Sequence, residues 1–599
     1  MKKRNVLCWI LVLACLASLL SGCAGARTSE TDEALPEEGA HEAVTMQSPF
    51  RNVTPFVDLV KQKYPEINLQ VIPYSGANTT AYVTNQLIAG DMPDIYMTTI
   101  YAPGQRDLSE RLLDLSGYAF TNNYSEARLR DVSENGAIYL LPTHFTCLGI
   151  TYNKTLLEEN GWALPTTFAE LEALAPKVRE AGYNLAVDQI ALPGYGFQYL
   201  CNILDTDFLN TLDGRGWQND FLRGSTTVKD APQMLQAMQT LEKWRQLGML
   251  NGSGSWESDE ETKQIMAEGK TLFMLGSLVS FKEGESRCEF GIMPYLSDDG
   301  TQNALILNVN RYIGLNKHLA DPGNEQKLAD AIRVMEVMST VEGLSALNTG
   351  FEDNTLLPLR DYVVPESNVF KQVESELNRG LTAPFIYAGW DNLIVPIGNV
   401  MLDYIKGRVE LSDVIAALDD NQRLLTDNSE AAYTTVTEKL DTDDCAKLVG
   451  ICFAQASGAD LAMVSKNKWY RIETYNTDLN TNGVSGSLFA LPVTDQEITS
   501  ILPTGWRGNI ETVTLTGQQV KELMKTGYVY KDMAFPYELV TPEGMTIDDG
   551  TTYTVAICGI SDEIAEAGNL TDTGILGLDA ARAYFSRFET LSPKDIRWE

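Results

Sequence analysis

Polar side chains follow a short apolar segment near residue 95. The turn Ala89–Asp94 (AGDMPD) precedes Ile95–Met97, which has the composition of a buried strand, and Thr98, Thr99 and Tyr101 come next. Ligands of open α/β sheets bind beyond the carboxyl ends of the strands. The hydroxyl groups of Thr98 and Tyr101 are therefore candidates for hydrogen bonding to a small polar molecule.

The residues that hydrolytic chemistry requires are not grouped in this sequence. Its three histidines, His41, His144 and His318, are far apart, whereas a two-metal phosphatase needs several His and Asp ligands. There is no Gly-x-Ser-x-Gly element, and no motif joins a Ser or Cys to His and Asp. No acidic pair stands out for glycoside hydrolysis. We expect no catalysis by this chain, no cofactor and no metal.

Residues 135–154 (NGAIYLLPTHFTCLGITYNK) are central to the organisation of the chain. They predict a turn, a strand over Ala137–Leu141, a break at Pro142 and a second strand over Cys147–Tyr152. Proline cannot donate to a strand ladder, so one continuous central strand is disfavoured. Two interpretations remain open, a buried hairpin or kinked strand and a crossover between two lobes.

The flanking sequence alternates between helical and strand patterns. A helix is predicted over Thr54–Lys63, a strand over Ile67–Ile72 and a helix over Asn78–Ala89. Thr167 and Glu170 form a capping box that opens another helix. A chain of 599 residues exceeds what one hydrophobic core usually serves, so we expect an α/β fold with two or more domains.

The formal net charge of the chain is −35. Such a surface repels phosphates, so nucleic acid is not an expected partner. Six cysteines from Cys147 to Cys558 are scattered without a Cys-x-x-Cys motif, and buried free thiols are the default expectation.

The first 22 residues have the pattern of a secretory signal. Lys2, Lys3 and Arg4 precede the apolar run Val6–Leu20. The ending Leu-Ser-Gly-Cys resembles a bacterial lipobox, which implies cleavage before Cys23 and lipidation of its thiol. A diacylglyceryl group would anchor the protein at the extracytoplasmic face of the cell membrane. Residues 23–42 are rich in Ser, Thr, Glu and Pro and predict an acidic flexible tether.

Residues 43–425 resemble the extracellular solute-binding proteins of ABC transporters, of the family 1 sugar-binding type. The resemblance rests on the Ala89–Asp94 turn, the Gly-x-x-Tyr-x-Leu-Pro and Tyr-Asn-Lys elements of 135–154, the helix after Thr167, and the segment Met266–Ser277. It implies a two-lobed Venus-flytrap fold, with crossovers near 142–152, 300–306 and 350–356. It also implies a carbohydrate or oligosaccharide as the solute and ABC permease subunits as partners.

The resemblance further implies that the solute binds between the lobes. Aromatic rings would cover the apolar faces of a sugar, and polar groups would satisfy its hydroxyls. Trp390, at the start of a late helix, has the strongest claim. The expected ligand-binding residues are Thr98, Tyr101, His144, Thr146, Tyr195, Phe197, Ser277, Trp390 and Asp391.

Residues 430–592 resemble the C-terminal domain of 5′-nucleotidases. The similar elements are Gly-Ala-Asp-Leu-Ala from Gly458, the Leu-Pro and Leu-Thr-Gly-x-x-Val-Lys pattern between 502 and 521, and Tyr-x-Val-Ala from Tyr553. The family's nucleotide-recognition elements are altered here, and Asn467, Arg471, Trp506 and Asn509 stand in their places. A degenerate module used for packing or for another ligand is the alternative.

These patterns leave three functions to separate. The first is a lipid-anchored receptor that presents a solute to an importer. The second is a nucleotide-binding protein that works with a catalytic domain on another chain, because the metallophosphatase domain is absent from this one. The third is a surface sensor or adhesion module.

Overall fold

A computed structural model of the chain describes residues 41–48, 53–73, 79–99, 108–134, 136–188, 193–252, 259–275, 286–349, 352–385, 390–426, 432–466, 483–502, 508–530, 533–558 and 570–598. All of them lie within one compact unit, His41–Glu599. The mixture of helices and strands confirms the predicted α/β class. Within the described ranges, no helix is both long enough and apolar enough to cross a membrane.

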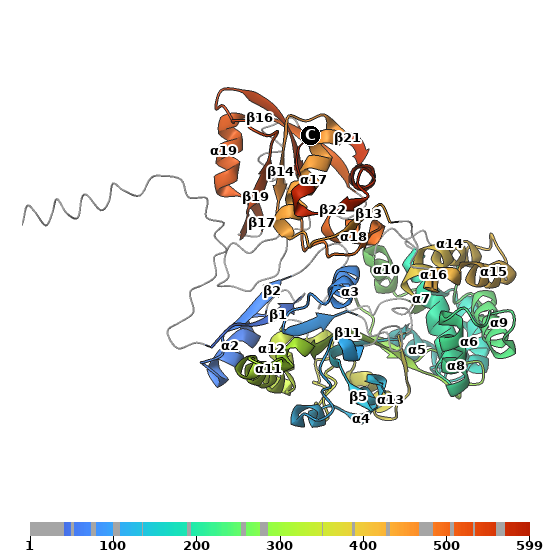
Figure 1. Cartoon of the computed structure of the whole chain (residues 1–599). Helices are drawn as coiled ribbons and strands as arrows, with labels where there is room; N and C mark the ends of the chain where they lie inside the picture. Colours follow the sequence, from blue (N-terminus) through green and yellow to red (C-terminus); the bar gives the residue numbers. More distant parts are fainter. Residues whose placement is uncertain are drawn as a thin grey trace, which may run out of the picture. The chain divides into compact units, whose positions relative to one another are not determined.

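The first lobe is built on a six-stranded sheet. Its order is β12 (Thr382–Pro384), β11 (Leu305–Leu315), β3 (Ile95–Thr98), β1 (Val44–Ser48) and β2 (Leu69–Pro73), and β6 (Leu141–Leu148) also pairs with β11. Helices α2 (Thr54–Lys63), α11 (Glu325–Met338) and α12 (Val341–Leu347) lie together beside this sheet (Figure 1). They bury one apolar face each, with Phe56, Val334 and Leu344 in a shared core, as helical periodicity requires.

The second lobe is built on a four-stranded sheet in the order β10 (Phe290–Met293), β7 (Ile150–Asn153), β9 (Thr271–Leu275) and β8 (Asn184–Asp188). Helices α6 (Phe168–Glu180), α7 (Pro193–Leu204), α9 (Pro232–Leu247), α14 (Ile394–Ile405) and α15 (Leu411–Asn421) contribute to its core. The predicted capping box of α6 is half formed. Thr167 Oγ1 accepts from the Glu170 amide at 3.2 Å, but the Glu170 carboxylate accepts from the Thr166 amide instead of the Thr167 amide.

The chain passes from the first sheet to the second between β6 and β7, at Gly149. It returns between β10 and β11. The predicted break at Pro142 is wrong, because Pro142 is the second residue of β6. A proline is tolerated close to the start of a strand, where few ladder bonds need its missing N–H.

The crossover predicted near 350–356 is also wrong. Leu356 and Phe370 pack with Phe145 in the first lobe, and β12 still pairs in parallel with β11. After β12, the next described element is η8 (Asp391–Leu393), whose Leu393 lies in the core of the second lobe. The segment before β12 has few regular elements, so periodicity gave no signal that it belongs to the first sheet.

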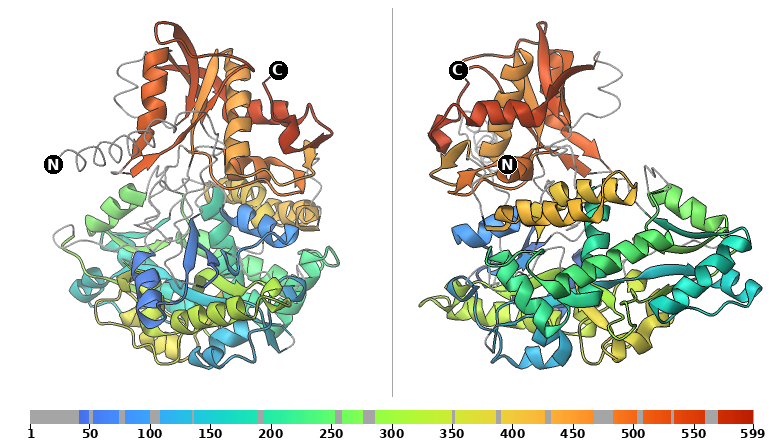
Figure 2. Two further views of the ribbon diagram at one scale, coloured as in Figure 1. Left: turned by 60° about the vertical axis from the view of Figure 1, so that its left-hand side comes forward. Right: turned by 90° about the vertical axis from the view of Figure 1, so that its right-hand side faces the viewer.

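The C-terminal domain has a five-stranded sheet in the order β19 (Tyr537–Val540), β14 (Leu461–Ser465), β20 (Thr552–Cys558), β16 (Asn509–Thr516) and β21 (Thr571–Leu576). One core joins it to α17 (Thr442–Ser457) and α21 (Gly577–Phe585), and another joins it to α19 (Gly517–Thr526). Figure 2 shows these helices beside the sheet. Thr494 and Glu497 form a capping box at the start of α18 (Asp495–Ile501).

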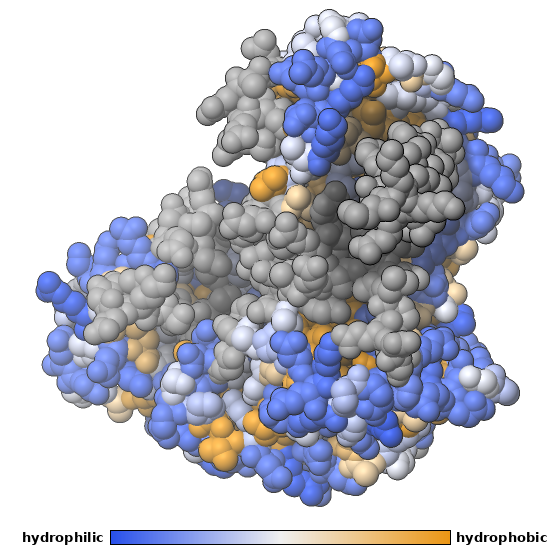
Figure 3. Space-filling model, turned by 90° about the vertical axis from the view of Figure 1, so that its left-hand side faces the viewer, coloured by the Kyte–Doolittle hydropathy of each residue, from blue (hydrophilic) through white to orange (hydrophobic). Residues whose placement is uncertain are grey.

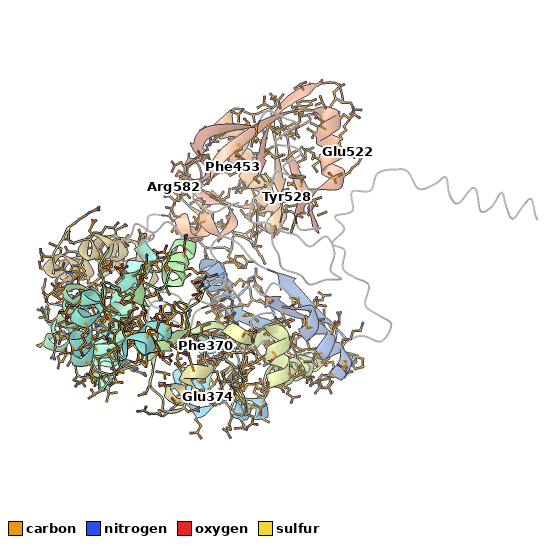
Figure 4. All side chains as sticks on the ribbon, turned by 180° about the vertical axis from the view of Figure 1, so that it is seen from behind. Phe370, Glu374, Phe453, Glu522, Tyr528 and Arg582 are labelled. Carbon is orange, nitrogen blue, oxygen red and sulfur yellow. The ribbon has the colours of Figure 1, made fainter. Side chains whose placement is uncertain are left out.

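Side chains lock these C-terminal elements together. Phe453 of α17 packs close to Gly577, where a Cβ would lie 3.1 Å from its ring. Arg582 of α21 binds the carboxylate of Asp495 with two guanidinium nitrogens, so α21 is tied to the first turn of α18. Figure 4 labels Phe453 and Arg582 in this domain.

Candidate functional site

Strand register places the site between the two sheets. Ile150, the first residue of β7 after the crossover, pairs with Leu275 at the end of β9, and Leu275 pairs with Asp188 at the end of β8. This row is the edge of the second sheet next to the crossover. The carboxyl ends of the parallel strands β8 and β9 meet there, which is where open α/β sheets bind ligands.

A two-stranded ribbon leads from the first sheet to this edge. In it β6 and β11 are antiparallel, and Leu148 pairs with Ile306 where β6 ends. Thr146 pairs with Asn308, and His144 pairs with Arg311. Polar residues thus follow one another along the ribbon that joins the lobes.

His144 is held as a neutral, buried group. Only 5% of the residue is exposed, and its Nδ1 lies 2.8 Å from Thr143 Oγ1. Burial, with the charge of Arg311 as a second cause, lowers the pKa of His144 to about 3. At neutral pH the imidazole can donate one hydrogen bond and accept another, but it carries no charge.

Thr98 is the last residue of β3 in the first sheet. It is buried, and it pairs with Tyr312 of β11. The next residue, Thr99, has its Oγ1 2.8 Å from Oγ1 of Thr80 in α3 (Thr79–Ala89). The hydroxyl-bearing end of β3 predicted from the sequence is thus present, although Tyr101 lies outside the described residues.

The predicted aromatic platform has a different environment from the one expected. Trp390 is 1% exposed, and its ring stacks on Phe221 with centroids 5.3 Å apart. Phe197, fully buried, lies 6.4 Å from the same indole. Both rings fill the core of the second lobe, so we do not count either as a solute contact.

The segment around Tyr195 is helical. It forms α7, which crosses α14 so closely that a Cβ on Gly398 would lie 2.2 Å from the Pro193 carbonyl oxygen. The glycines at 196 and 398 permit this approach, and the tight packing buries Phe197. Tyr195 itself remains half-buried.

Some of the remaining predicted residues lie in the described ranges, and the others lie outside them. Asp391 begins η8. Asn509, exposed on β16, donates to Asp572 at 3.2 Å. Cys23, Ser277, Asn467, Arg471 and Trp506 lie outside the described residues. In the described ranges no group of three or more His, Cys, Asp or Glu is placed to hold a metal ion.

Asp188 and Arg311 were not among the site residues predicted from the sequence. Asp188 follows the apolar run Leu185–Val187. It could have been found by the signal that selected Thr98, namely a polar residue at the carboxyl end of a buried strand. Arg311 had no such signal, because only the pairing of β6 with β11 brings it opposite His144.

Residues 44–313 match the family model described as bacterial extracellular solute-binding protein. No curated protein matches the chain by sequence. Among solved structures, a family 1 extracellular solute-binding protein from Bifidobacterium longum subsp. infantis is similar at 17% identity, with a TM-score of 0.53 over 64% of this chain and 100% of its own. A binding protein from Bacillus subtilis in an open conformation gives 15% identity and a TM-score of 0.52 over 66% of this chain and 100% of its own.

A third similar structure is the bacterial solute receptor AcbH, at 11% identity and a TM-score of 0.52 over 64% of this chain and 100% of its own. At these identities the likeness is one of fold. The family match over residues 44–313 and the shared fold together support the resemblance of the N-terminal part of the chain to bacterial extracellular solute-binding proteins.

Proposed function

We propose that this protein is a membrane-anchored, extracytoplasmic receptor that captures a carbohydrate-like solute and presents it to the permease of an ABC importer. The observation that carries the proposal is the ribbon of β6 and β11, which leads from the first sheet to the row of strand ends in the second sheet that contains Asp188. The family match covers this ribbon.

The polar groups around the ribbon favour a neutral, hydroxyl-bearing solute. Thr98, Thr146 and neutral His144 are polar residues without a charge. Hydrophilic residues cover most of the described surface on the face shown in Figure 3, and the net charge of −35 disfavours anionic solutes. AcbH, which shares the fold, is described as a receptor with a preference for β-D-galactopyranose.

Binding would favour the closed arrangement of the two lobes, because only that arrangement contacts the solute from both sides. The ribbon then has to bend while its hydrogen bonds persist. The irregular register at Val309–Tyr312 is a place where the pairing is already interrupted.

A thermal-shift panel of sugars, nucleosides and nucleotides on the full chain tests the proposal. A ligand at a hundredfold excess over its Kd stabilises the native state by about 2.7 kcal/mol, which such a scan detects. We expect a shift with at least one mono- or oligosaccharide, and isothermal titration to confirm one site. If no carbohydrate shifts the transition while a nucleotide does, the receptor proposal fails.

For the C-terminal domain we propose a fold like that of the 5′-nucleotidase C-terminal domain, without catalysis by this chain. A second candidate function of the protein is nucleotide binding by this domain. It is favoured by Asn467 and Arg471, which follow β14 in the sequence, and by Trp506, which precedes β16. Release of phosphate from AMP by the purified chain with Mn²⁺ would contradict the absence of catalysis. Loss of nucleotide binding in Arg471→Ala, with sugar binding retained, would support nucleotide binding by the C-terminal domain.

Lipid anchoring at Cys23 remains part of the proposal. Expression of the chain in bacteria with labelled palmitate should give a labelled product, and Cys23→Ala should abolish the label. A labelled Cys23→Ala product would contradict lipid anchoring at Cys23, but it would not affect the proposal of solute binding.

A further inference from the structure

Asp188 is a carboxylate at the edge of the second sheet that faces the crossover. It is the last residue of β8, and it pairs with Leu275 in the same row as Ile150. The residue is fully buried. A carboxylate without solvent needs hydrogen-bond donors for both of its oxygens.

Only one oxygen of Asp188 has such donors. Oδ2 accepts from the backbone amides of Asn251 at 3.1 Å and Gly252 at 3.3 Å. The Asn251 side chain is fixed in turn, because its Nδ2 donates to the Ala186 carbonyl at 2.8 Å. The turn after α9 therefore holds the carboxylate in one orientation.

The second oxygen, Oδ1, is buried and has no hydrogen-bond partner. Leaving a buried acceptor unsatisfied costs stability, and such groups in native proteins call for an explanation. Among the described residues, its neighbours in the sheet are apolar, because Leu275 pairs with Asp188 and Val187 precedes it. A donor supplied by a bound solute at the strand ends would satisfy Oδ1.

We propose that Asp188 Oδ1 accepts a hydrogen bond from a hydroxyl of the solute and so selects neutral hydroxyl-bearing rings over their acidic counterparts. This inference rests on the proposed function. Burial raises the pKa of the Asp188 carboxyl above its ordinary value, while the amides of Gly252 and Asn251 lower it. In its ionised form the group has only acceptor oxygens, so it accepts from hydroxyl donors and repels a uronate carboxylate. Its fixed orientation means that little side-chain freedom is lost on binding.

Matched sugar pairs test the proposal on the full chain. The probes are galactose and galacturonate, glucose and glucuronate, and a galacto-oligosaccharide with an oligogalacturonide, each titrated calorimetrically. The wild-type protein should bind a neutral member at least tenfold more tightly than its acidic partner. Asp188→Asn should weaken binding of the neutral sugar about tenfold to a hundredfold, because a bond to a charged acceptor is lost. The Asp188→Asn substitution should also reduce the difference in affinity between the neutral sugar and its acidic partner.

Asp220→Asn is the control, because this aspartate is exposed in the same lobe. It should leave both affinities unchanged. Equal binding by wild type and a folded Asp188→Asn variant would overturn the inference and leave the receptor function intact. Preference of the wild type for a uronate would overturn it without any variant, so the test holds even if Asp188→Asn does not fold. Binding of no carbohydrate at all would overturn the proposed function together with this inference.

Discussion

His144 and Arg311 face each other across the ribbon that joins the two lobes, as direct partners in the pairing of β6 with β11. A guanidinium opposite a buried imidazole disfavours a second positive charge, and burial disfavours it more. The same burial lowers the pKa of Arg311 from its ordinary value. At this position of the ribbon, a charged Arg311 is therefore compatible with a neutral His144, but not with a protonated one.

Acid should destabilise the protein through His144. Its pKa of about 3 in the folded chain lies below the ordinary value of 6.5, so the unfolded chain binds the proton first. The stability contributed by the neutral ring is complete above pH 6.5 and is lost as the pH falls toward 3. His144→Gln should remove this loss, at up to about 1.4 kcal/mol per pH unit. Urea denaturation at pH 7, 6, 5 and 4 measures the free energy of unfolding of wild type and variant. The same dependence of this free energy on pH in both proteins would contradict the prediction.

The buried carboxyl of Asp205 should act in the opposite direction. It lies in η3 (Asp205–Leu209), is 1% exposed, and neither of its oxygens has a hydrogen-bond partner. Burial raises its pKa well above the ordinary value, against the attraction of Arg215. The folded chain then holds the proton longer than the unfolded chain, so stability falls as the pH rises above about 4. Asp205→Asn should gain stability relative to wild type with rising pH, measured by urea denaturation between pH 4 and 8.

Asp207, two residues away, provides the control for Asp205. Its carboxylate accepts from the Asp298 amide and from Thr240 Oγ1, both at 3.0 Å. Asp207→Asn should destabilise the protein at pH 7 by about 1–3 kcal/mol, because it weakens satisfied bonds. If both substitutions shift stability in the same direction at pH 8, an unpartnered carboxyl is not the cause of the Asp205 effect.

The first lobe was more predictable from the sequence than the second. Periodicity gave α2 with its bounds. Thr98 was expected just after a strand and is the last residue of β3, whereas His144 was expected between two strands and lies within β6. The environment of the predicted aromatic residues could not be read from the sequence, because it depends on how the helices pack. Nothing local to Phe197 or Trp390 shows that α7 and α14 cross at two glycines and close the core over both rings.

The strand ends of the C-terminal domain carry a charge cluster. Lys466 follows β14 and is 7% exposed, and its Nζ binds Asp443 at 2.8 Å and Glu538 at 2.9 Å. Lys466→Met would leave two carboxylates facing each other without their cation, at a cost of about 2–4 kcal/mol. Lys521→Met is the matched control, because its pair with Asp549 is exposed and should contribute less than about 1 kcal/mol. Equal losses in the two variants, measured by chemical denaturation, would rule out a role for burial.

The Tyr82–Phe489 contact ties the first lobe to the C-terminal domain. Their ring centroids lie 5.3 Å apart, and both residues belong to one apolar cluster. Lys439 lies 5.5 Å from the Phe489 ring centroid and binds Asp91 at 2.5 Å. These contacts connect α3 and the turn after it to Lys439 and Phe489, so the first lobe and the C-terminal domain should unfold together rather than independently.

Phe489→Ala should break this coupling. Loss of a buried aromatic ring costs about 3–5 kcal/mol where the surroundings do not collapse. Calorimetry should show a lowered transition that separates into two, since the remaining Lys439–Asp91 pair is half-exposed and contributes little. Val529→Ala, at a side chain in β17 (Tyr528–Tyr530) that is 54% exposed, should leave the transition in place. An unchanged single transition in Phe489→Ala would show that the ring does not hold the two parts together, because a contact that carries the coupling cannot be removed without loss.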